Sequence, residues 1–389
     1  MERLRITGGR VLLRSDGEQD VDLTLEDGRI TGVGRDGRGA EFDARGLLVL
    51  PGIVDIHGDA FERQLQPRPG VGFAADIALL DTEAQLLANG ITTAFHGVTL
   101  SWEPGLRSLT AWQALLDALE ARRWTCDMRV HLRWEAYNLD ALDIALADIA
   151  AGRVHLLAFN DHTPSILKKL KDPVANVKYS DRAGMKLHEF HALAEQVSER
   201  AHAVPVALER MAAAARNAGL PMASHDDATI ATRQAFRERG ADICEFPMAQ
   251  EVGEEARAAG DWVVRGCPNV VRGGSHLGWA SAARMAEAGI CRVLASDYFY
   301  PAMLRAAMIL AGRGVLDLPQ AWELISANPA AAAKLTDRGA IAEGLRADVV
   351  LVDPASPRVV ATMVGGRIAY VTAEGASRLP SGAVHAMMK

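Results

Sequence analysis

The sequence has little of what marks secreted or membrane-bound proteins. Its four cysteines, Cys126, Cys244, Cys267 and Cys291, are far apart and form no CxxC pair. Structural disulfides are therefore not expected, and a reducing cytoplasm is the predicted location. No apolar run approaches the roughly 20 residues of a membrane span. The first residues, MERLRITGGRVLLRSDGEQ, contain no apolar signal-peptide core.

An excess of positive charge is also lacking. The chain has 42 Lys and Arg against 49 Asp and Glu, a formal net charge of −7, so binding to nucleic acid or to an anionic membrane is not expected. Hydrophobic residues make up 49% and charged residues 23% of the 389 positions, which is typical of a globular protein with a large core. The net charge does not exclude a polyanionic small substrate, because binding of such a substrate depends on local clusters of basic residues.

The rhythm of the chain changes twice. The first 50 residues alternate apolar and polar positions with Gly and Asp at turns, and the alternation returns after residue 340 in GLRADVVLVDPASPRVVATMVGGRIAYV. We expect residues 1–51 and 340–380 to pair into one small β-sandwich domain. Between them, over residues 52–339, short apolar strands alternate with Ala- and Leu-rich helical stretches, as in βα units.

Eight strands are predicted in this middle region, which indicates a (β/α)8 barrel. The expected ranges are 53–57, 91–96, 128–134, 154–160, 221–225, 242–246, 262–266 and 292–297. The long gap from 162 to 221 predicts a basic loop and helices that cover a ligand.

Imidazoles and carboxylates follow several of these strands, at the face where such barrels hold their active sites. Divalent transition metals take mixed nitrogen and oxygen ligands. We therefore predict one or two divalent ions, with zinc as the first choice and manganese or iron as alternatives. Asp161 and Asp226 are expected to orient histidines, and His131 to be structural or exposed. The predicted ligands are His57, Asp59, Glu135, His162, His225 and Asp297.

Asp297, in LASDYFYP, is the candidate general acid and base. A carboxylate beside an activated water can take its proton and return it to the leaving group. The alternative role is a buried Asp that caps the next helix.

Three basic segments follow strands 1, 4 and 7 and look suited to anions: ERQLQPRPG, SILKKLKDPVANVKYS and NVVRGGSH. Guanidinium groups clamp phosphate in a bidentate way, and paired glycines let backbone N–H groups approach an oxyanion. The predicted substrate-binding residues are Arg68, Lys168, Lys178, Arg272 and His276.

Several motifs resemble the amidohydrolase superfamily. LPGIVDIHGD and GAIAEGLRADVVLVD are similar to its flanking signatures, while ASHDDAT, CEFP, PNVVRGGSH and LASDYFYP resemble its phosphonate-metabolism branch. The resemblance runs over essentially the whole chain. It implies a metal-dependent diphosphatase that converts α-D-ribose 1-methylphosphonate 5-triphosphate to the 5-phosphate and pyrophosphate. The His-x-Asp motif of that branch supports His57 and Asp59 as ligands, whereas SILKKLKDP departs from the branch pattern.

Two other functions remain open from the sequence. The superfamily mostly hydrolyses C–N bonds, so a deacetylase, deaminase or cyclic amidase is the alternative enzyme. A barrel without catalytic activity would be a scaffold. A homodimer is expected, because large barrels often pair.

Overall fold

The structure is a computed structural model, and it describes residues 3–14, 17–34, 39–68, 70–170, 172, 179, 183–274 and 281–380. Its centre is one parallel eight-stranded sheet in which each strand pairs with the next in chain order. The predicted (β/α)8 barrel is confirmed, and every expected strand is present. The strands are β8 (Ile53–Gly58), β9 (Ile91–Leu100), β10 (Asp127–Glu135), β11 (Leu156–Asn160), β12 (Met222–His225), β13 (Ile243–Glu245), β14 (Trp262–Gly266) and β15 (Cys291–Ala295).

The sheet nearly closes between its first and last strands. Strands β8 and β15 meet through an isolated parallel bridge between Gly58 and Asp297, at their carboxyl ends. Closure at this end brings residues from the beginning and the end of the barrel together at its mouth, where a barrel enzyme holds its active site.

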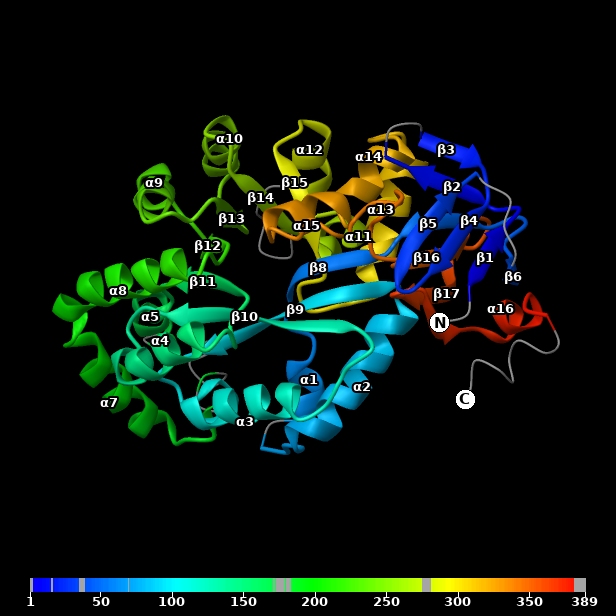
Figure 1. The fold of residues 1–389 in the computed structure, drawn as a ribbon. Helices are drawn as coiled ribbons and strands as arrows, with labels where there is room; N and C mark the ends of the chain where they lie inside the picture. Colours follow the sequence, from blue (N-terminus) through cyan, green and yellow to red (C-terminus); the bar gives the residue numbers. More distant parts are fainter. Residues whose placement is uncertain are drawn as a thin grey trace.

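Helices cover the outside of the barrel, as βα units require (Figure 1). Where the structure describes the predicted insertion between β11 and β12, the chain forms the helices α5, α7 and α8, and its basic segment SILKKL is helical rather than a loop. Among the described residues between β8 and β12, the helices are α1 (Glu62–Leu65), α2 (Ala75–Ala88), α3 (Leu109–Glu120), α4 (Leu142–Ala150), α5 (Thr163–Leu170), α7 (Leu187–Ser198) and α8 (Val204–Asn217), with short 3-10 turns at Gly105–Arg107, Leu139–Ala141 and Ala201–Ala203. Those after β12 are α9 (Ile230–Glu238), α10 (Gln250–Ala258), α11 (Cys267–Arg272), α12 (Ala282–Glu287), α13 (Ala302–Gly312), α14 (Leu318–Glu323) and α15 (Ala327–Ala332).

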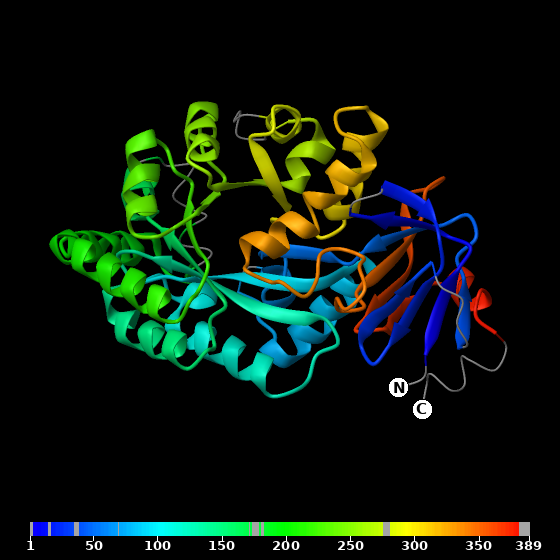
Figure 2. The ribbon, with the colours of Figure 1, turned by 45° about the horizontal axis from the view of Figure 1, so that its top comes forward.

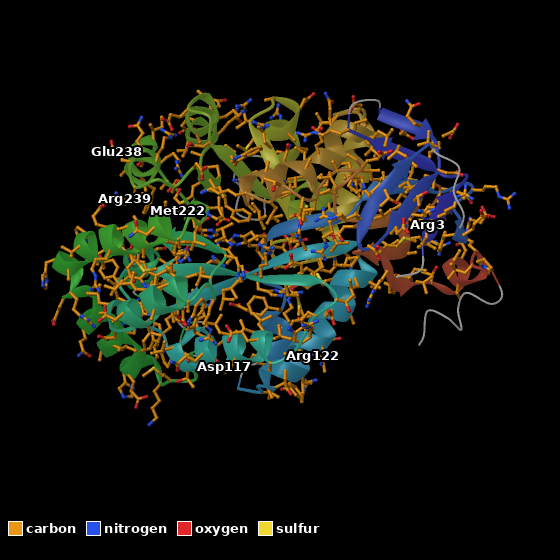
Figure 3. The ribbon with its side chains drawn as sticks, viewed as in Figure 1. Arg3, Asp117, Arg122, Met222, Glu238 and Arg239 are labelled. Atoms are coloured by element: carbon orange, nitrogen blue, oxygen red, sulfur yellow. The ribbon has the colours of Figure 1, made fainter. Side chains whose placement is uncertain are left out.

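Buried side chains fill the inside of the barrel, so it is a packed core. Figure 3 draws the described side chains around the ribbon. Small and branched residues on the inner faces of the strands, such as Ile56, Ala158 and Val264, form one buried cluster. Their neighbours on the outer faces pack against the helices; Leu132 and Phe159 belong to that second cluster. This alternation explains why the barrel strands are nearly continuous apolar runs in the sequence.

Both ends of the described chain form a β-sandwich beside the barrel, at the right of Figures 1 and 2. One sheet has the order β5-β4-β1-β6 and the other β18-β17-β16-β7-β2-β3, and the two share a hydrophobic core. The division into a barrel domain, 52–339, and a domain from 1–51 and 340–380 stays a prediction. The strands are β1 (Leu4–Thr7), β2 (Arg10–Leu13), β3 (Gly17–Asp20), β4 (Leu23–Glu26), β5 (Arg29–Val33), β6 (Ala40–Asp43), β7 (Leu48–Pro51), β16 (Val349–Asp353), β17 (Arg358–Val364) and β18 (Arg367–Val371), followed by α16 (Ala373–Ser377).

None of the described helices has the length and apolar character that crossing a membrane requires.

Candidate metal and substrate site

Three of the predicted ligands are joined by backbone hydrogen bonds at the seam of the barrel. Asp297 N donates to the carbonyl of His57 at 2.9 Å, and Asp59 N donates to the carbonyl of Asp297 at 2.9 Å. The end of β8 and the residue after β15 are therefore held side by side. The sequence separates these residues by more than 200 positions, and the barrel closure brings them together.

The buried side chain of Asp55, on β8, links the first barrel strand to the residue that follows the last one. Its Oδ1 accepts the backbone N–H of Ser296 at 3.0 Å and that of His57 at 3.3 Å, while its Oδ2 accepts the Ser296 hydroxyl at 2.5 Å. Burial raises the pKa of Asp55 to about 6 even though these hydrogen bonds favour the carboxylate. Asp55 thus fixes the backbone of His57 against β15.

Donor atoms that could hold a metal gather in two groups among the described residues. The outer group consists of His162, His225 and Asp226, whose donor atoms lie within 4.8 Å of one another. His162 Nε2 lies 3.5 Å and His225 Nε2 lies 3.7 Å from the Asp226 carboxylate. Asp226, expected only to orient a histidine, is thus in a position to offer a ligand oxygen itself.

Glu135 lies behind His162. Its Oε1 is 2.5 Å from His162 Nδ1, and its Oε2 accepts the backbone N–H of His162 at 3.1 Å. Both carboxylate oxygens therefore contact His162, which leaves Nε2 of that ring turned to Asp226. In this arrangement Glu135 orients a histidine, a role that metal sites commonly give to carboxylates.

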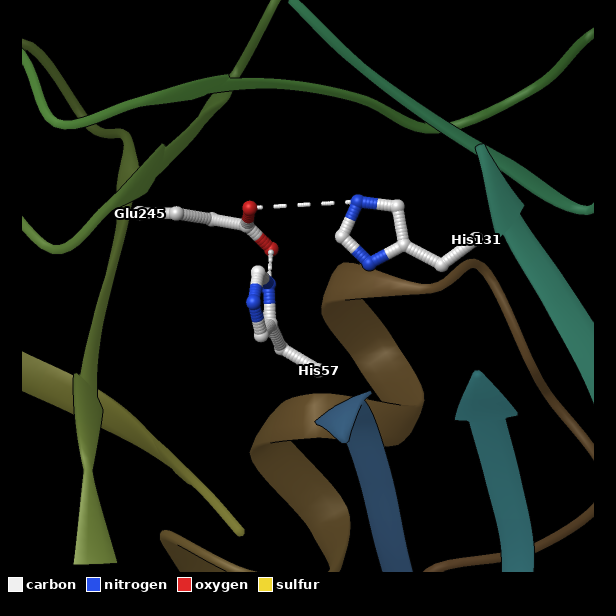
Figure 4. Close-up of side chains that lie close together, drawn as sticks. All are labelled: His57, His131 and Glu245. Carbon is white, nitrogen blue, oxygen red and sulfur yellow. Dashed lines mark ion pairs between the residues drawn. The ribbon is translucent and has the colours of Figure 1, made fainter. Parts of the chain in front are cut away.

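The deeper group consists of His57, His131 and Glu245 (Figure 4). The Glu245 Oε1 atom lies 3.0 Å from His57 Nδ1, and its Oε2 atom lies 3.8 Å from His131 Nε2. All three side chains are buried, with at most 1% of each exposed. The sequence did not single out Glu245, and His131 was expected to be structural or exposed.

Three residues in the left-handed backbone region follow the barrel strands at this mouth. Asp226, Phe246 and Asp297 have φ values of 57°, 52° and 56°. Non-glycine residues adopt this region at a cost of about 1 kcal/mol or more each, and such strain concentrates at functional sites. The turns aim the side chains around them into the mouth of the barrel.

Burial shifts the pKa values of the histidines and of the carboxyl groups at the site in opposite directions. Burial lowers the pKa of His57 and of His131 to about 3, and it raises the pKa of Glu245 to about 7. Burial, together with the negative charge of Asp59, raises the pKa of Asp297 to about 7. For His162, burial opposes the charge, but Glu135 and Asp226 outweigh it and raise the pKa to about 9.

The outer group opens into a cleft of about 200 Å³. Cationic side chains from three elements share this cleft with the donor atoms, which places positive charge beside a candidate metal position. The lining residues are Glu103, Arg107, Arg133, His162, Ser165, Ile166, Lys169, Tyr179, His225 and Asp226.

None of the predicted phosphate-binding residues is found in the lining of this cleft: three lie outside the cleft, and two lie outside the residues that the structure describes. Arg68, Lys168 and Arg272 are exposed and do not line this cleft, although Lys168 precedes Lys169 on α5. Arg272 Nη1 lies 3.5 Å from the Tyr298 hydroxyl. Lys178 and His276 lie outside the described residues.

The barrel and the imidazoles and carboxylates at its mouth define a hydrolase of the amidohydrolase type. The sequence profile described as the amidohydrolase family matches residues 48–376, and the chain belongs to this family. The resemblance expected from the motifs is confirmed.

Curated relatives extend this comparison. The chain is similar to the α-D-ribose 1-methylphosphonate 5-triphosphate diphosphatase of Escherichia coli (strain K12), with 34% identity over 322 residues, 79% of this chain and 84% of the relative. An allantoinase from Bacillus licheniformis is 35% identical over 101 residues, 25% of this chain and 21% of that enzyme.

Solved structures share the fold at low sequence identity. A beta-aspartyl dipeptidase from Fervidobacterium islandicum AW-1 has a TM-score of 0.62 and 15% identity, with 95% of this chain and 97% of that chain covered. A D-hydantoinase from a Bacillus species, AR9, has a TM-score of 0.62 and 16% identity, with 95% of each chain covered.

Proposed function

We propose that this enzyme hydrolyses a ribose 5-triphosphate, with α-D-ribose 1-methylphosphonate 5-triphosphate as substrate, to the 5-phosphate and pyrophosphate in phosphonate catabolism. One observation carries the proposal: the cleft that contains the outer donor group is also lined by Arg107, Arg133 and Lys169. A triphosphate needs such cations beside the reacting phosphorus, where negative charge builds in the transition state. The similarity to the Escherichia coli diphosphatase supports the same substrate.

We infer that His57, Asp59, His162, His225 and Asp297 hold one or two divalent ions, with zinc preferred over manganese or iron because the donors are imidazole and carboxylate. The residues fit such an ion, since the donor atoms of His162, His225 and Asp226 lie within 4.8 Å of one another and the buried His57 Nδ1 has no hydrogen-bond partner. A bound ion supplies Lewis acidity and lowers the pKa of water. Glu135 was also predicted as a ligand; because both of its carboxylate oxygens contact His162, we propose that it acts at the ion by orienting that histidine.

Each remaining residue has a role that follows from its position. Water adds to the α-phosphorus, the bond to the bridging oxygen breaks, and pyrophosphate leaves. Asp297 accepts the proton of the water, because its pKa of about 7 suits a general base at neutral pH. Arg107 and Lys169 are proposed to pair with the phosphoryl oxygens of the leaving group. Arg68, Lys168, Lys178, Arg272 and His276 stay proposals for binding the outer part of the substrate.

Hydrolysis of a C–N bond is the second candidate. Local similarity to two enzymes favours it: the allantoinase already described, and a dihydroorotase from Syntrophotalea carbinolica that is 44% identical over 59 residues. Both matches cover only short parts of the chain. The cationic lining of the cleft favours the triphosphate over an uncharged cyclic amide. A scaffold without activity would have no need for the converging buried donors.

Phosphorus NMR of the products from a panel of ribose 5-triphosphates separates these functions. We expect pyrophosphate and a 5-phosphate, with activity abolished by a chelator and restored by zinc or manganese. Cyclic amides, including a hydantoin and dihydroorotate, are the contrasting substrates. Their turnover without pyrophosphate release from any triphosphate would overturn the proposal.

The four free and buried cysteines support a cytoplasmic location. We also propose a homodimer, which sedimentation at micromolar concentration tests.

A further inference from the structure

The carboxylate of Glu245 is buried among three imidazoles. His57 Nδ1 lies 3.0 Å from Oε1, while His225 Nδ1 at 3.3 Å and His131 Nε2 at 3.8 Å approach Oε2. Figure 4 shows His57 and His131 turned toward this carboxylate from β8 and β10. The solvent-exposed fraction of Glu245 is 0%, so no bulk water completes its coordination.

The ring of His131 has a defined tautomer. Its Nδ1 lies 3.0 Å from the carbonyl oxygen of Ile56. A carbonyl only accepts, so Nδ1 carries the proton, and in the neutral ring Nε2 then has a lone pair. That lone pair faces the Glu245 carboxylate, and two acceptors without a proton between them repel each other. Metal-binding histidines are commonly oriented in this way, with the second ring nitrogen bonded to a backbone carbonyl.

Three donor atoms in the deep group lack a hydrogen bond: His57 Nδ1, His131 Nε2 and Glu245 Oε1. Buried polar atoms are almost always paired. His57 Nδ1 and Glu245 Oε1 lie 3.0 Å apart without hydrogen-bond geometry, and His131 Nε2 lies 3.8 Å from Oε2, so no hydrogen bond joins these atoms. A cation satisfies all three at once.

The spacing fits a small ion. Donors about 2.1 Å from a tetrahedral zinc lie about 3.4 Å apart, and the gaps of 3.0 and 3.8 Å to Glu245 bracket that value. Mg²⁺, which prefers six oxygen ligands, does not fit two imidazoles and one carboxylate.

We propose that His57 Nδ1, His131 Nε2 and the Glu245 carboxylate form a deep site for one zinc-type divalent ion, and that Glu245 links it to the outer group through His225. This site completes the metal centre of the proposed hydrolase and makes His131 and Glu245 ligands. His57 is then a ligand of the deep ion.

Metal content of three single variants tests the proposal. H131Q and E245Q, dialysed against buffered zinc, should each bind one zinc ion fewer per chain than the wild type. H96Q is the matched control, because His96 is also buried, on β9, with both ring nitrogens unpartnered and its ring against Phe61 rather than Glu245. It should keep the wild-type zinc content. Folded H131Q and E245Q proteins with full zinc content would overturn the site.

Anomalous diffraction at the zinc edge from wild-type crystals decides the matter if the variants do not fold. A peak about 2.0–2.3 Å from both His131 Nε2 and Glu245 is expected. A peak only between His162 and His225 would overturn the deep site and leave the diphosphatase proposal standing. A peak at the deep site in an enzyme that releases no pyrophosphate would support the deep site and overturn the diphosphatase proposal. With magnesium in place of zinc, calorimetry should show no binding at this site.

Discussion

Arg133 Nη2 lies 2.9 Å from Nε2 of His225. A guanidinium can only donate, so His225 Nε2 accepts, and its Nδ1 carries the proton that faces Glu245. The second Arg133 nitrogen, Nη1, is 3.5 Å from the Asp59 carboxylate. Arg133 therefore occupies the lone pair that a metal ion in the outer group would use, and an ion bound there must displace it.

Removing this guanidinium should strengthen metal binding. R133M keeps most of the side-chain volume but removes a positive charge beside the outer group, so the apparent affinity for zinc should rise about tenfold or more. Competition with a chromogenic chelator measures it. R129M is the control, because Arg129 lies on the same strand but pairs with Asp127, at the opposite end of β10. Equal affinity in R133M and the wild type would contradict the role of Arg133.

Neighbouring lysines on α5 should differ in their effect on substrate binding. Lys169 lines the cleft and Lys168 does not. Loss of one charge-assisted contact to phosphate corresponds to about a tenfold weaker interaction, so K169Q should raise KM for the triphosphate about tenfold, while K168Q stays within about twofold. Initial rates of pyrophosphate release provide the comparison. Equal changes in the two variants would place the triphosphate elsewhere.

Stability of the metal-free protein should fall at alkaline pH. The pKa of His162 is raised from 6.5 to about 9 in the folded protein, so the stabilisation by protonated His162 is complete below about pH 6.5 and is lost as pH rises through about 9. The loss is up to about 3 kcal/mol. Urea unfolding of chelator-treated protein at both ends of this range measures it. In E135Q, which lacks the main charge partner, the pH dependence should shrink; an unchanged slope would show that another group causes it.

Asp297 should be needed for turnover more than for metal retention. D297N removes the base but keeps one oxygen donor for the ion, so at saturating zinc the metal content should stay near that of the wild type while kcat falls at least about a hundredfold. Elemental analysis and rate measurements on the same preparation test both parts. A D297N enzyme with near wild-type kcat would remove the general-base role.

Much of the fold could be predicted, because parallel strands buried on both faces are short apolar runs between helical stretches. The main difference is the length of β9, which continues to Leu100 although the expected strand stopped at His96. Gly97 looks like a strand end in the sequence, but in the barrel a Cβ at this position would come within 3.3 Å of Arg133 Cδ, so glycine serves close packing there.

Only part of the site could be predicted. Polar residues at the ends of strands can be recognised in a sequence, whereas polar residues inside strands look like surface positions and are missed. His57, His162 and His225 belong to the first kind. His131 belongs to the second, yet β10 carried a signal: Arg129, His131, Arg133 and Glu135 recur at every second position, while the residues between them are apolar. A polar face of this kind on a barrel strand points to the mouth.

Glu245 and Lys169 carried no comparable signal. Glu245 is the last residue of the short strand β13, and only the pairing of this strand with β12 shows that it reaches His225. Lys169 and Lys168 are equivalent in sequence, and the helical rotation of α5 decides which one faces the cleft.

In the proposed reaction, water attacks the α-phosphorus of a ribose 5-triphosphate. Hydrolysis in water enriched in heavy oxygen, followed by mass spectrometry of both products, tests it most directly. We expect one labelled oxygen in the 5-phosphate product and none in pyrophosphate, with no reaction in the presence of a chelator. Label in pyrophosphate, or stepwise release of inorganic phosphate, would contradict it.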